Sequence, residues 1–154
     1  MSREYPERPV VGVGVVILGA GKVLLVRRGK PPREGQWSLP GGAQKLGETV
    51  FEAAAREVRE ETGLGVEVLG LADVVDTIRN DDDGRIRYHY TLVDVFAVVR
   101  DGTLRAGGDA AAAAWFDLAD VAGLGLWSET ERIINLAVEM HEVLGGDRGG
   151  GAAD

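Results

Sequence analysis

The chain has 154 residues, no cysteine and a formal net charge of −8. This length predicts one domain that can bury a core without cross-links. The absence of cysteine excludes disulfide bonds, thiolate metal sites and a cysteine nucleophile. The acidic charge argues against a nucleic-acid polymer as partner, because such binding needs a basic surface. No apolar run has the length of a membrane-spanning helix, and the N-terminus lacks the apolar core of a signal peptide, so we expect a cytoplasmic protein.

The first elements are two strands. Residues 1–9 carry two prolines and mixed charge, and we expect them to be flexible. Residues 10–18 are apolar and rich in β-branched side chains, which predicts a strand, and a turn leads to a second strand over residues 22–28. Gly12 and Gly14 do not form a dinucleotide-binding fingerprint, because no third glycine and no helix follow them.

Two residues near the second strand are candidates for substrate contact. Arg27 either contacts a phosphate of the substrate or only solvates an edge of the sheet. Trp37 follows a loop rich in Gly and Pro, and it is either part of the core or a platform for stacking on a base.

Residues 42–64 contain the most informative stretch. Thr49 and Glu52 form a predicted capping box, and Gly63 can adopt the left-handed conformation that ends a helix. Between these caps, apolar residues recur at helical spacing and predict one buried stripe. Its members are Phe51, Ala54, Ala55 and Val58.

Acidic side chains lie beside that stripe. Glu57 and Glu61 are four residues apart, so their Cβ atoms lie about 5–6 Å from each other on a helix, and Glu60 is their neighbour. Two partly buried carboxylates at this spacing repel by roughly 3 kcal/mol, whereas the cost in open water is only a few tenths. Either the pair is solvated, or a cation lies between the carboxylates. A hard divalent ion such as Mg²⁺ is the natural candidate, since it prefers oxygen ligands.

Two long strands should follow. Residues 66–78 read as a strand broken near Gly70, and residues 85–100 as its partner, joined by a polar turn over residues 80–84. We interpret that turn as a solvated hairpin tip rather than a second metal site. Asp94 interrupts the apolar pattern of the partner strand, so it either caps a backbone group or faces a cleft.

The last third mixes strand and helix signals. Residues 109–116 are rich in alanine, which favours a helix by composition alone. Ser128 and Glu131 form a second predicted capping box, which begins an amphipathic helix that ends at Gly145. The Gly-rich tail, residues 146–154, is expected to be disordered. Strands alternating with two helices predict an α/β domain with a mixed sheet between helices.

The stretch from Gly42 to Leu64 resembles the Nudix box at every defined position. The resemblance covers roughly residues 10–145 and implies a Nudix fold, an α/β/α sandwich. It also implies hydrolysis of a nucleoside diphosphate linked to another moiety, with Mg²⁺ or Mn²⁺ as cofactor. By this resemblance the metal ligands are Glu57, Glu60, Glu61 and the carbonyl of Gly42.

Further roles follow from the same resemblance. Arg56 orients the glutamates, Glu48 supports the helix, and Glu60 or Glu61 is the general base. In some family members the base lies outside the box, and Glu129 is then a candidate. The end of the alanine-rich segment is expected to be a short strand, followed by a short helix near residues 118–121.

The substrate is left open between two alternatives. The segments around Trp37 and residues 88–94 resemble short bacterial ADP-ribose pyrophosphatases, which yield AMP and ribose 5-phosphate. A proline typical of those enzymes beyond the box is missing, so a MutT-type triphosphate pyrophosphohydrolase is the alternative. A non-catalytic nucleotide sensor is a further hypothesis, which the intact set of glutamates disfavours. The sequence is also compatible with a homodimer.

Overall fold

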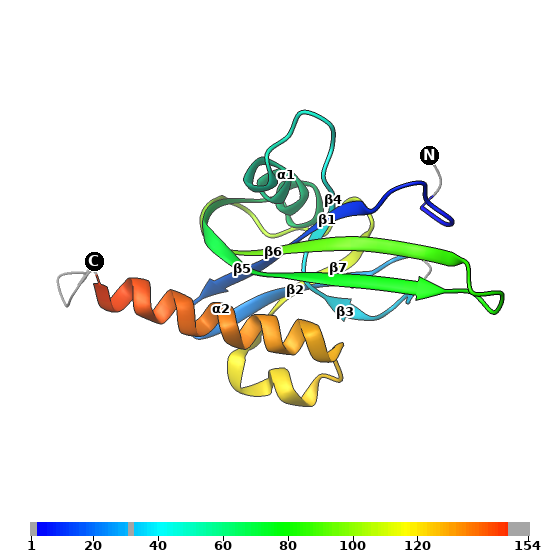
Figure 1. Cartoon of the computed structure of the whole chain (residues 1–154). Helices are drawn as coiled ribbons and strands as arrows, with labels where there is room; N and C mark the ends of the chain where they lie inside the picture. Colours follow the sequence, from blue (N-terminus) through cyan, green and yellow to red (C-terminus); the bar gives the residue numbers. More distant parts are fainter. Residues whose placement is uncertain (1–2, 31–32, 148–154) are drawn as a thin grey trace.

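A single mixed sheet lies between two helices in the computed structural model, which describes residues 3–30 and 33–147 (Figure 1). The elements in chain order are β1 (Val10–Gly19), β2 (Lys22–Arg28), β3 (Trp37–Ser38), β4 (Gly41–Ala43), α1 (Val50–Thr62), β5 (Leu64–Asn80), β6 (Ile86–Gly102), β7 (Ala110–Asp117), the 3₁₀ helix η1 (Leu118–Gly123) and α2 (Ser128–Asp147). The strand order is β3-β2-β1-β6-β5, with β4 added to β1 and β7 to β2. Among the strands of the described residues, only the β1–β6 pair is parallel.

The two helices cover opposite faces of the sheet, and each closes its own core (Figure 1). Strand β1 serves both cores, since successive side chains of a strand point to opposite faces. Val15 and Ile17 pack on the α1 side, whereas Val16 and Leu18 pack on the α2 side. This is why β1 reads as a continuous apolar run, and the predicted α/β/α sandwich is confirmed.

The strand β4 brings the start of the glutamate-rich segment against β1. Gly14 pairs with Gly41, and Val13 pairs with Gly42. A Cβ atom at Gly41 would lie 1.9 Å from the carbonyl oxygen of Val13, and the backbone φ there is 158°. Only glycine allows this close approach. It fixes the position of β4, and therefore of the loop that leads into α1.

The alanine-rich segment forms a strand along its whole length. β7 runs antiparallel to β2, with Ala113 opposite Val26 and Trp115 opposite Leu24. Pairing with β2 therefore overrides the helix propensity of alanine, which is a weak preference. We expected only the end of this segment to be a strand, so that expectation was too narrow. The short helix after it is confirmed as η1.

Helix α2 differs from the prediction at both ends. Ser128 is its first helical residue, so Trp127 occupies the capping position, and the Trp127 carbonyl accepts a hydrogen bond from the Glu131 amide at 3.1 Å. The predicted Ser128–Glu131 capping box is therefore wrong. The helix also continues past Gly145 to Asp147. Of the predicted disordered tail, residues 148–154 lie outside the described residues, so that prediction is not tested.

The turn between β5 and β6 is a hairpin tip, as predicted. The Asp81 carboxylate accepts hydrogen bonds from the Asp83 and Arg85 amides, both at 2.9 Å. Tyr5, in the N-terminal segment, donates its hydroxyl hydrogen to the same carboxylate at 2.8 Å. Asp81 is thus used by the turn and by Tyr5. The flexibility predicted for residues 1–9 stays a prediction; residues 1–2 lie outside the described ranges.

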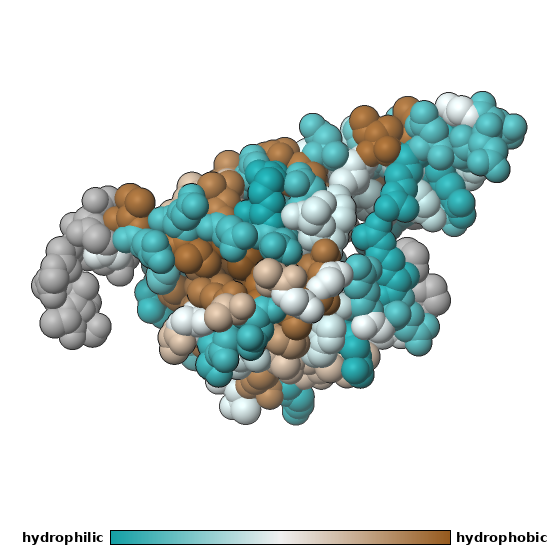
Figure 2. Space-filling model, turned by 90° about the horizontal axis from the view of Figure 1, so that it is seen from below, coloured by the Kyte–Doolittle hydropathy of each residue, from teal (hydrophilic) through white to brown (hydrophobic). Residues whose placement is uncertain are grey.

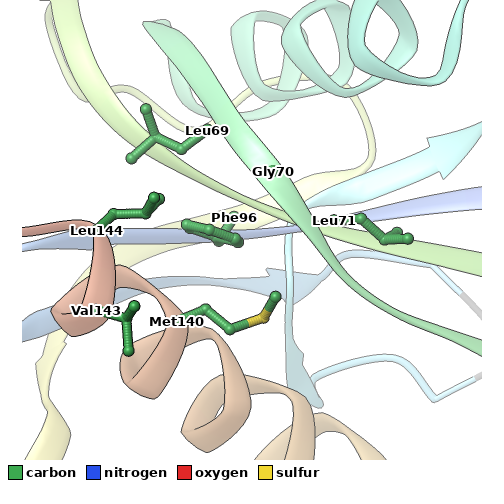
Figure 3. Close-up of a pocket in the computed structure, with 7 residues that line it drawn as sticks. All are labelled: Leu69, Gly70, Leu71, Phe96, Met140, Val143 and Leu144. Carbon is green, nitrogen blue, oxygen red and sulfur yellow. The ribbon is translucent and has the colours of Figure 1, made fainter. Parts of the chain in front are cut away.

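An apolar groove of about 350 Å³ lies between β5 and the last turns of α2 (Figure 3). Gly70 lies at a bulge in β5 and faces the ring of Phe96, with Met140 on the helix side. A second cavity of about 590 Å³ lies beside the β1–β2 turn, where Trp115 and His141 are among its lining residues. Neither is lined by the glutamates of α1. No described helix is both long enough and apolar enough to cross a bilayer.

Candidate active site

Helix α1 has the predicted caps at both ends. The Thr49 hydroxyl accepts from the Glu52 amide at 3.0 Å, and the Glu52 carboxylate accepts from the Thr49 amide at 2.8 Å. Gly63 ends the helix with φ 75°. The loop after β6 covers the last turn, where the Arg105 amide donates to the Thr62 carbonyl and the Gly107 amide to the Glu61 carbonyl. These bonds satisfy carbonyls that a helix end leaves unpaired.

The buried face of α1 is rotated from the predicted stripe. Phe51 is 45% exposed, whereas Ala53 and Thr62 are fully buried with Ala54 and Val58. Small side chains let the helix approach the sheet closely, and the Thr62 hydroxyl is satisfied by the Val58 carbonyl at 2.7 Å. The prediction that Phe51 begins the buried stripe is wrong. Because of the helical repeat, Glu57 and Glu61 still lie at the border of the buried face.

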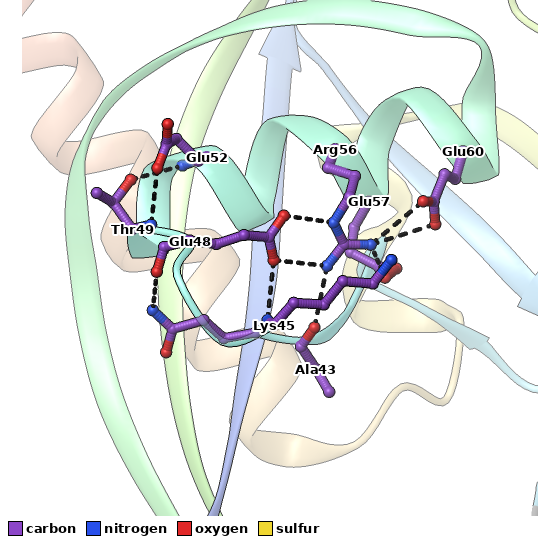
Figure 4. Close-up of polar contacts among 9 residues, drawn as sticks. Ala43, Lys45, Glu48, Thr49, Glu52, Arg56, Glu57 and Glu60 are labelled. Atoms are coloured by element: carbon purple, nitrogen blue, oxygen red, sulfur yellow. Dashed lines mark hydrogen bonds and ion pairs between the residues drawn. The ribbon is translucent and has the colours of Figure 1, made fainter.

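Arg56 is the centre of a charged cluster on α1 (Figure 4). Its guanidinium donates to Glu48 at 2.5 and 3.0 Å, to Glu57 at 2.9 Å, and to Glu60 at 3.3 Å. It also donates to the carbonyl of Ala43 at 3.1 Å. The Arg56 side chain is 21% exposed, and those of Glu48 and Glu57 are even less so. A single arginine therefore links the loop, β4 and three carboxylates, as the predicted orienting role requires.

Glu48 is held in its ionised form. The two hydrogen bonds from Arg56, assisted by one from the Lys45 amide at 2.8 Å, lower the pKa of the Glu48 carboxyl to about 2. Paired charges of this kind make the strong, geometrically specific hydrogen bonds of a bidentate contact. The contact fixes the plane of the Arg56 guanidinium, and through it the side chains of Glu57 and Glu60.

Gly42 provides room for the carboxylate of Glu57. A Cβ atom at Gly42 would lie 2.5–2.6 Å from all three atoms of that carboxylate. The Glu57 side chain therefore rests directly on the backbone of β4. This brings together two of the predicted metal-binding groups, the carboxylate of Glu57 and the backbone of Gly42.

Glu61 lies on the inner side of the same helix. Its carboxylate accepts a hydrogen bond from the Gly41 amide at 2.9 Å. Burial raises the pKa of Glu61 to about 7; the Gly41 amide opposes this, and the charge of Glu57 adds to it. Asp109 also raises that pKa, whereas Arg28 lowers it. Glu61 is therefore a partly buried carboxyl whose ionisation depends on the positive charge around it.

Taken together, the predicted metal ligands lie on one side of α1 and β4, but they point in different directions. Glu57 and Glu60 turn to Arg56, while Glu61 turns to Gly41. Within the described ranges, no three acidic or histidine side chains converge closely enough to enclose a cation. The donor set nevertheless fits a hard divalent ion, because it offers only carboxylate and carbonyl oxygens. Two of these donor groups are already adjacent, because the Glu57 carboxylate lies against the backbone of Gly42.

The two predicted substrate-contacting residues lie apart from the glutamates. Arg27 pairs with Trp37 between β2 and β3, and its guanidinium carbon lies 5.8 Å from the centre of the indole ring. Trp37 also packs edge-on against Phe116, with ring centres 4.9 Å apart, on the α2 side of the sheet. The charge of the next residue, Arg28, acts on Glu61 instead. Sequence alternation could have separated the two arginines, because neighbouring strand residues point to opposite faces.

A second polar cluster lies on the α2 face of the sheet. Asp94 is only 7% exposed, and a Cβ atom at Gly14 would lie 2.2 Å from its carboxylate oxygen. Burial raises the pKa of Asp94 to about 6, and the charge of Asp73 adds to this effect. Arg132 of α2 bonds Asp73 at 3.0 Å and Glu129 at 2.9 and 3.1 Å. Glu129, the predicted extra carboxylate, is thus engaged across the sheet from α1.

Comparisons with known proteins identify a matching family. The NUDIX domain family matches residues 8–136. An ADP-ribose pyrophosphatase from Methanocaldococcus jannaschii is 38% identical over 126 residues, which cover 82% of this chain and 71% of that protein. A MutT-like protein from Streptomyces ambofaciens is 45% identical over 69 residues, covering 45% of this chain and 43% of that protein.

Solved structures share the fold. A MutT NUDIX hydrolase from Burkholderia pseudomallei superposes with a TM-score of 0.72 and 32% identity, covering 84% of this chain and 98% of that one. An ADP-ribose pyrophosphatase from Streptococcus suis superposes with a TM-score of 0.67 and 26% identity, covering 87% of this chain and 92% of that one.

Proposed function

Since this chain belongs to the Nudix hydrolase family, we propose that it hydrolyses ADP-ribose to AMP and ribose 5-phosphate in the presence of a divalent metal. In this reaction water adds to one phosphorus of the diphosphate, the bridging P–O bond breaks, and each product carries one phosphate. The single observation that carries the proposal of a metal-assisted site is the placement of the carboxylates of Glu57 and Glu61 against the glycines of β4.

The choice of ADP-ribose rests on similarity of sequence. The relative named as an ADP-ribose pyrophosphatase matches this chain over most of both lengths, whereas the MutT-like relative matches under half of either. The longer match to the ADP-ribose pyrophosphatase includes regions outside α1. In a fold whose members share their central chemistry, such regions determine which substrate is bound.

We assign the cation, Mg²⁺ or Mn²⁺, to Glu57, Glu60, Glu61 and the carbonyl of Gly42. Such an ion neutralises charge on phosphoryl oxygens and lowers the pKa of a bound water. Arg56 keeps the side chains of Glu57 and Glu60 in place, and Glu48 in turn fixes Arg56. Their role is positioning, because they hold charged groups in a defined geometry before substrate arrives.

Glu61 is our preferred general base, with Glu60 as the alternative. Glu61 lies in a partly buried position with a pKa raised to about 7, close to the pH at which a base is most effective. Glu60 is more exposed, with 47% of its side chain accessible. Positive charge near Glu61, from Arg28 or from a cation, favours the ionised form that accepts a proton.

Arg27 and Trp37 are proposed to contact the nucleoside end of the substrate. The indole is only partly buried, and the guanidinium above it adds a positive charge at the surface. A planar base can stack on such a pair. We assign Arg28 to the diphosphate instead, because its charge acts on Glu61. Nudix hydrolases act on small nucleotides. We also propose that this chain is located in the cytoplasm.

A MutT-type activity is the second candidate, because 98% of the MutT NUDIX hydrolase structure superposes on this chain. Incubation with ADP-ribose and with 8-oxo-dGTP, with products identified by mass, distinguishes the two. ADP-ribose hydrolysis yields AMP and ribose 5-phosphate. Triphosphate hydrolysis yields a nucleoside monophosphate and pyrophosphate. Selective release of AMP supports our proposal, and selective cleavage of the triphosphate overturns it. Binding without any product would support a sensor.

A further inference from the structure

Two ion pairs join β2 to β7, one near each end of the two strands. Lys22 pairs with Asp117 at 3.4 Å. Lys30, two residues beyond β2, pairs with Asp109, one residue before β7, at 3.1 Å. All four side chains are about half exposed or more, and exposed ion pairs contribute little to stability. A difference in role between the two pairs must therefore come from their surroundings.

The backbone places the Lys30–Asp109 pair beside the candidate active site. The Gly107 amide donates a hydrogen bond to the Glu61 carbonyl at 3.1 Å, so the loop between β6 and β7 rests on the last turn of α1. The Gly29 amide donates to the Asp109 carbonyl at 3.0 Å. These two bonds fix the end of that loop, and the beginning of the loop after β2, next to Glu61.

The charges around Glu61 agree with this placement. Asp109 raises the pKa of Glu61 and Arg28 lowers it, so both side chains lie close enough to act on its carboxylate. Arg28 is the last residue of β2, and Lys30 follows it by two positions. Two cations thus lie in one short stretch beside Glu61, in a chain whose net charge is −8. Such a local concentration of positive charge favours an anionic ligand.

The α2 side of the molecule has a different character. Figure 2 views the molecule from the side of α2 and η1, and it shows apolar surface between polar side chains. Exposed residues of the groove beside β5, such as Leu71 and Val143, contribute to this surface. Apolar surface does not attract a polyanion. The phosphates of a substrate are therefore expected at the cationic stretch near Glu61, at the end of α1.

We propose that Lys30 binds the diphosphate of the substrate together with Arg28, and that Asp109 holds the Lys30 ammonium while the site is empty. This inference rests on the proposed hydrolysis of a diphosphate substrate. Lysine carries a compact charge on a flexible stem, so its ammonium can leave one anionic partner for another. The exposed pair with Asp109 costs little to break. A diphosphate offers several charged oxygens, which accept strong hydrogen bonds.

The alternative role for Lys30 is that it only neutralises Asp109. The two roles predict opposite couplings between these residues. If Lys30 binds the diphosphate, Asp109→Asn releases the ammonium and tightens binding, and most of this gain requires Lys30. If Lys30 only neutralises Asp109, Lys30→Gln leaves the aspartate charge unopposed beside the site. Asp109→Asn then tightens binding at least as much in the Lys30→Gln background as in the wild type.

Isothermal titration calorimetry of the full chain with α,β-methylene-ADP in excess Mg²⁺ tests the inference. The methylene bridge of this diphosphate cannot be hydrolysed, so binding is measured without turnover. Lys30→Gln should weaken binding by about tenfold, because a charge-assisted hydrogen bond is lost at an exposed position. Lys30→Arg keeps the charge and should retain most of the affinity. Lys22→Gln is the matched control, since it removes the corresponding lysine at the other end of β2 and should bind like the wild type.

A double-mutant cycle separates the two roles of Lys30. Asp109→Asn should tighten binding by about twofold to fivefold, the size of an exposed ion pair, and by less in the Lys30→Gln background. Far-UV circular dichroism confirms that each variant is folded. The inference is overturned if Lys30→Gln loses no more affinity than Lys22→Gln, or if the gain in Asp109→Asn does not depend on Lys30. It is equally overturned if the wild type does not bind the probe.

Cleavage of ADP-ribose by the same proteins keeps this inference distinct from the proposed function. Cleavage by the wild type, with unchanged probe affinity in Lys30→Gln, rejects the role of Lys30 alone. Binding of the probe that depends on Lys30, without cleavage of ADP-ribose, rejects the proposed function alone.

Discussion

Arg56 and Glu48 are joined by two hydrogen bonds, of 2.5 and 3.0 Å, between loop and helix. Replacing Arg56 by Ala removes the guanidinium group that donates hydrogen bonds to Glu48, Glu57 and Glu60. We expect kcat/KM to fall by about tenfold to a hundredfold. Losses of this size are typical when a residue that holds metal ligands in place is removed. Steady-state kinetics at several metal concentrations, with the apparent metal affinity as the second readout, measures this loss.

Arg59→Ala is the control for that experiment. Arg59 is on the same helix and pairs with Asp101 at 2.7 Å, but both side chains are more than half exposed. Exposed pairs contribute little to stability, so activity and stability should be nearly unchanged. Equal losses in Arg56→Ala and Arg59→Ala would contradict the positioning role of Arg56.

Gly42→Ala tests the contact between β4 and Glu57. The new Cβ atom would lie 2.5–2.6 Å from the carboxylate, so the Glu57 side chain must move. The backbone of Gly42 does not need a left-handed conformation, so the fold should persist. We expect lower activity and weaker metal binding with little change in the melting temperature. Gly123→Ala, where nothing lies within 4 Å of the added atom, should behave like the wild type. Unchanged activity in Gly42→Ala would show that Glu57 does not need this position.

Asp94→Asn tests the second polar cluster through its pH dependence. The folded-state pKa of Asp94 is raised to about 6, above its ordinary value of 3.8, so ionisation of this carboxyl opposes folding. The loss of folding stability caused by this ionisation is absent below pH about 4, grows as the pH rises to about 6, and is constant above that. The asparagine variant should therefore be more stable than the wild type at neutral pH, by about 3 kcal/mol at most.

Urea unfolding of both proteins from mildly acidic to neutral pH measures the difference. The gain in Asp94→Asn should shrink toward zero as the pH approaches 4. Glu67→Gln is a control at an exposed position of β5. A difference between wild type and Asp94→Asn that does not vary with pH would contradict the raised pKa of Asp94.

The sequence predicted the helix that carries the glutamates well, and the reasons are local. The capping box at Thr49 and the left-handed Gly63 depend on a few adjacent residues, as does the turn at Asp81. The spacing of the Nudix box likewise lies within one continuous stretch. The hairpin of β5 and β6 was also predicted, because turn residues separate two apolar segments. The predicted break near Gly70 is wrong: β5 continues through this position and has only a bulge there.

Features that depend on distant residues were missed. The exposure of Phe51 follows from how closely α1 approaches the sheet, which no periodicity reveals. The alanine-rich segment is a strand because β2 lies beside it. The influence of Arg28 and Asp109 on Glu61 arises from tertiary contacts around the end of α1. A local pattern could not indicate which of the two neighbouring arginines faces Glu61 without the orientation of β2.

The most direct test is the hydrolysis of ADP-ribose by the wild type and by Glu61→Gln, with Mg²⁺ or Mn²⁺ and with excess chelator. We predict AMP and ribose 5-phosphate from the wild type only when metal is present. Glu61→Gln should lose about a hundredfold to ten-thousandfold in kcat while remaining folded, since it replaces a partly buried carboxyl by a neutral group of equal size. Full turnover in chelator, or in Glu61→Gln, would contradict the account.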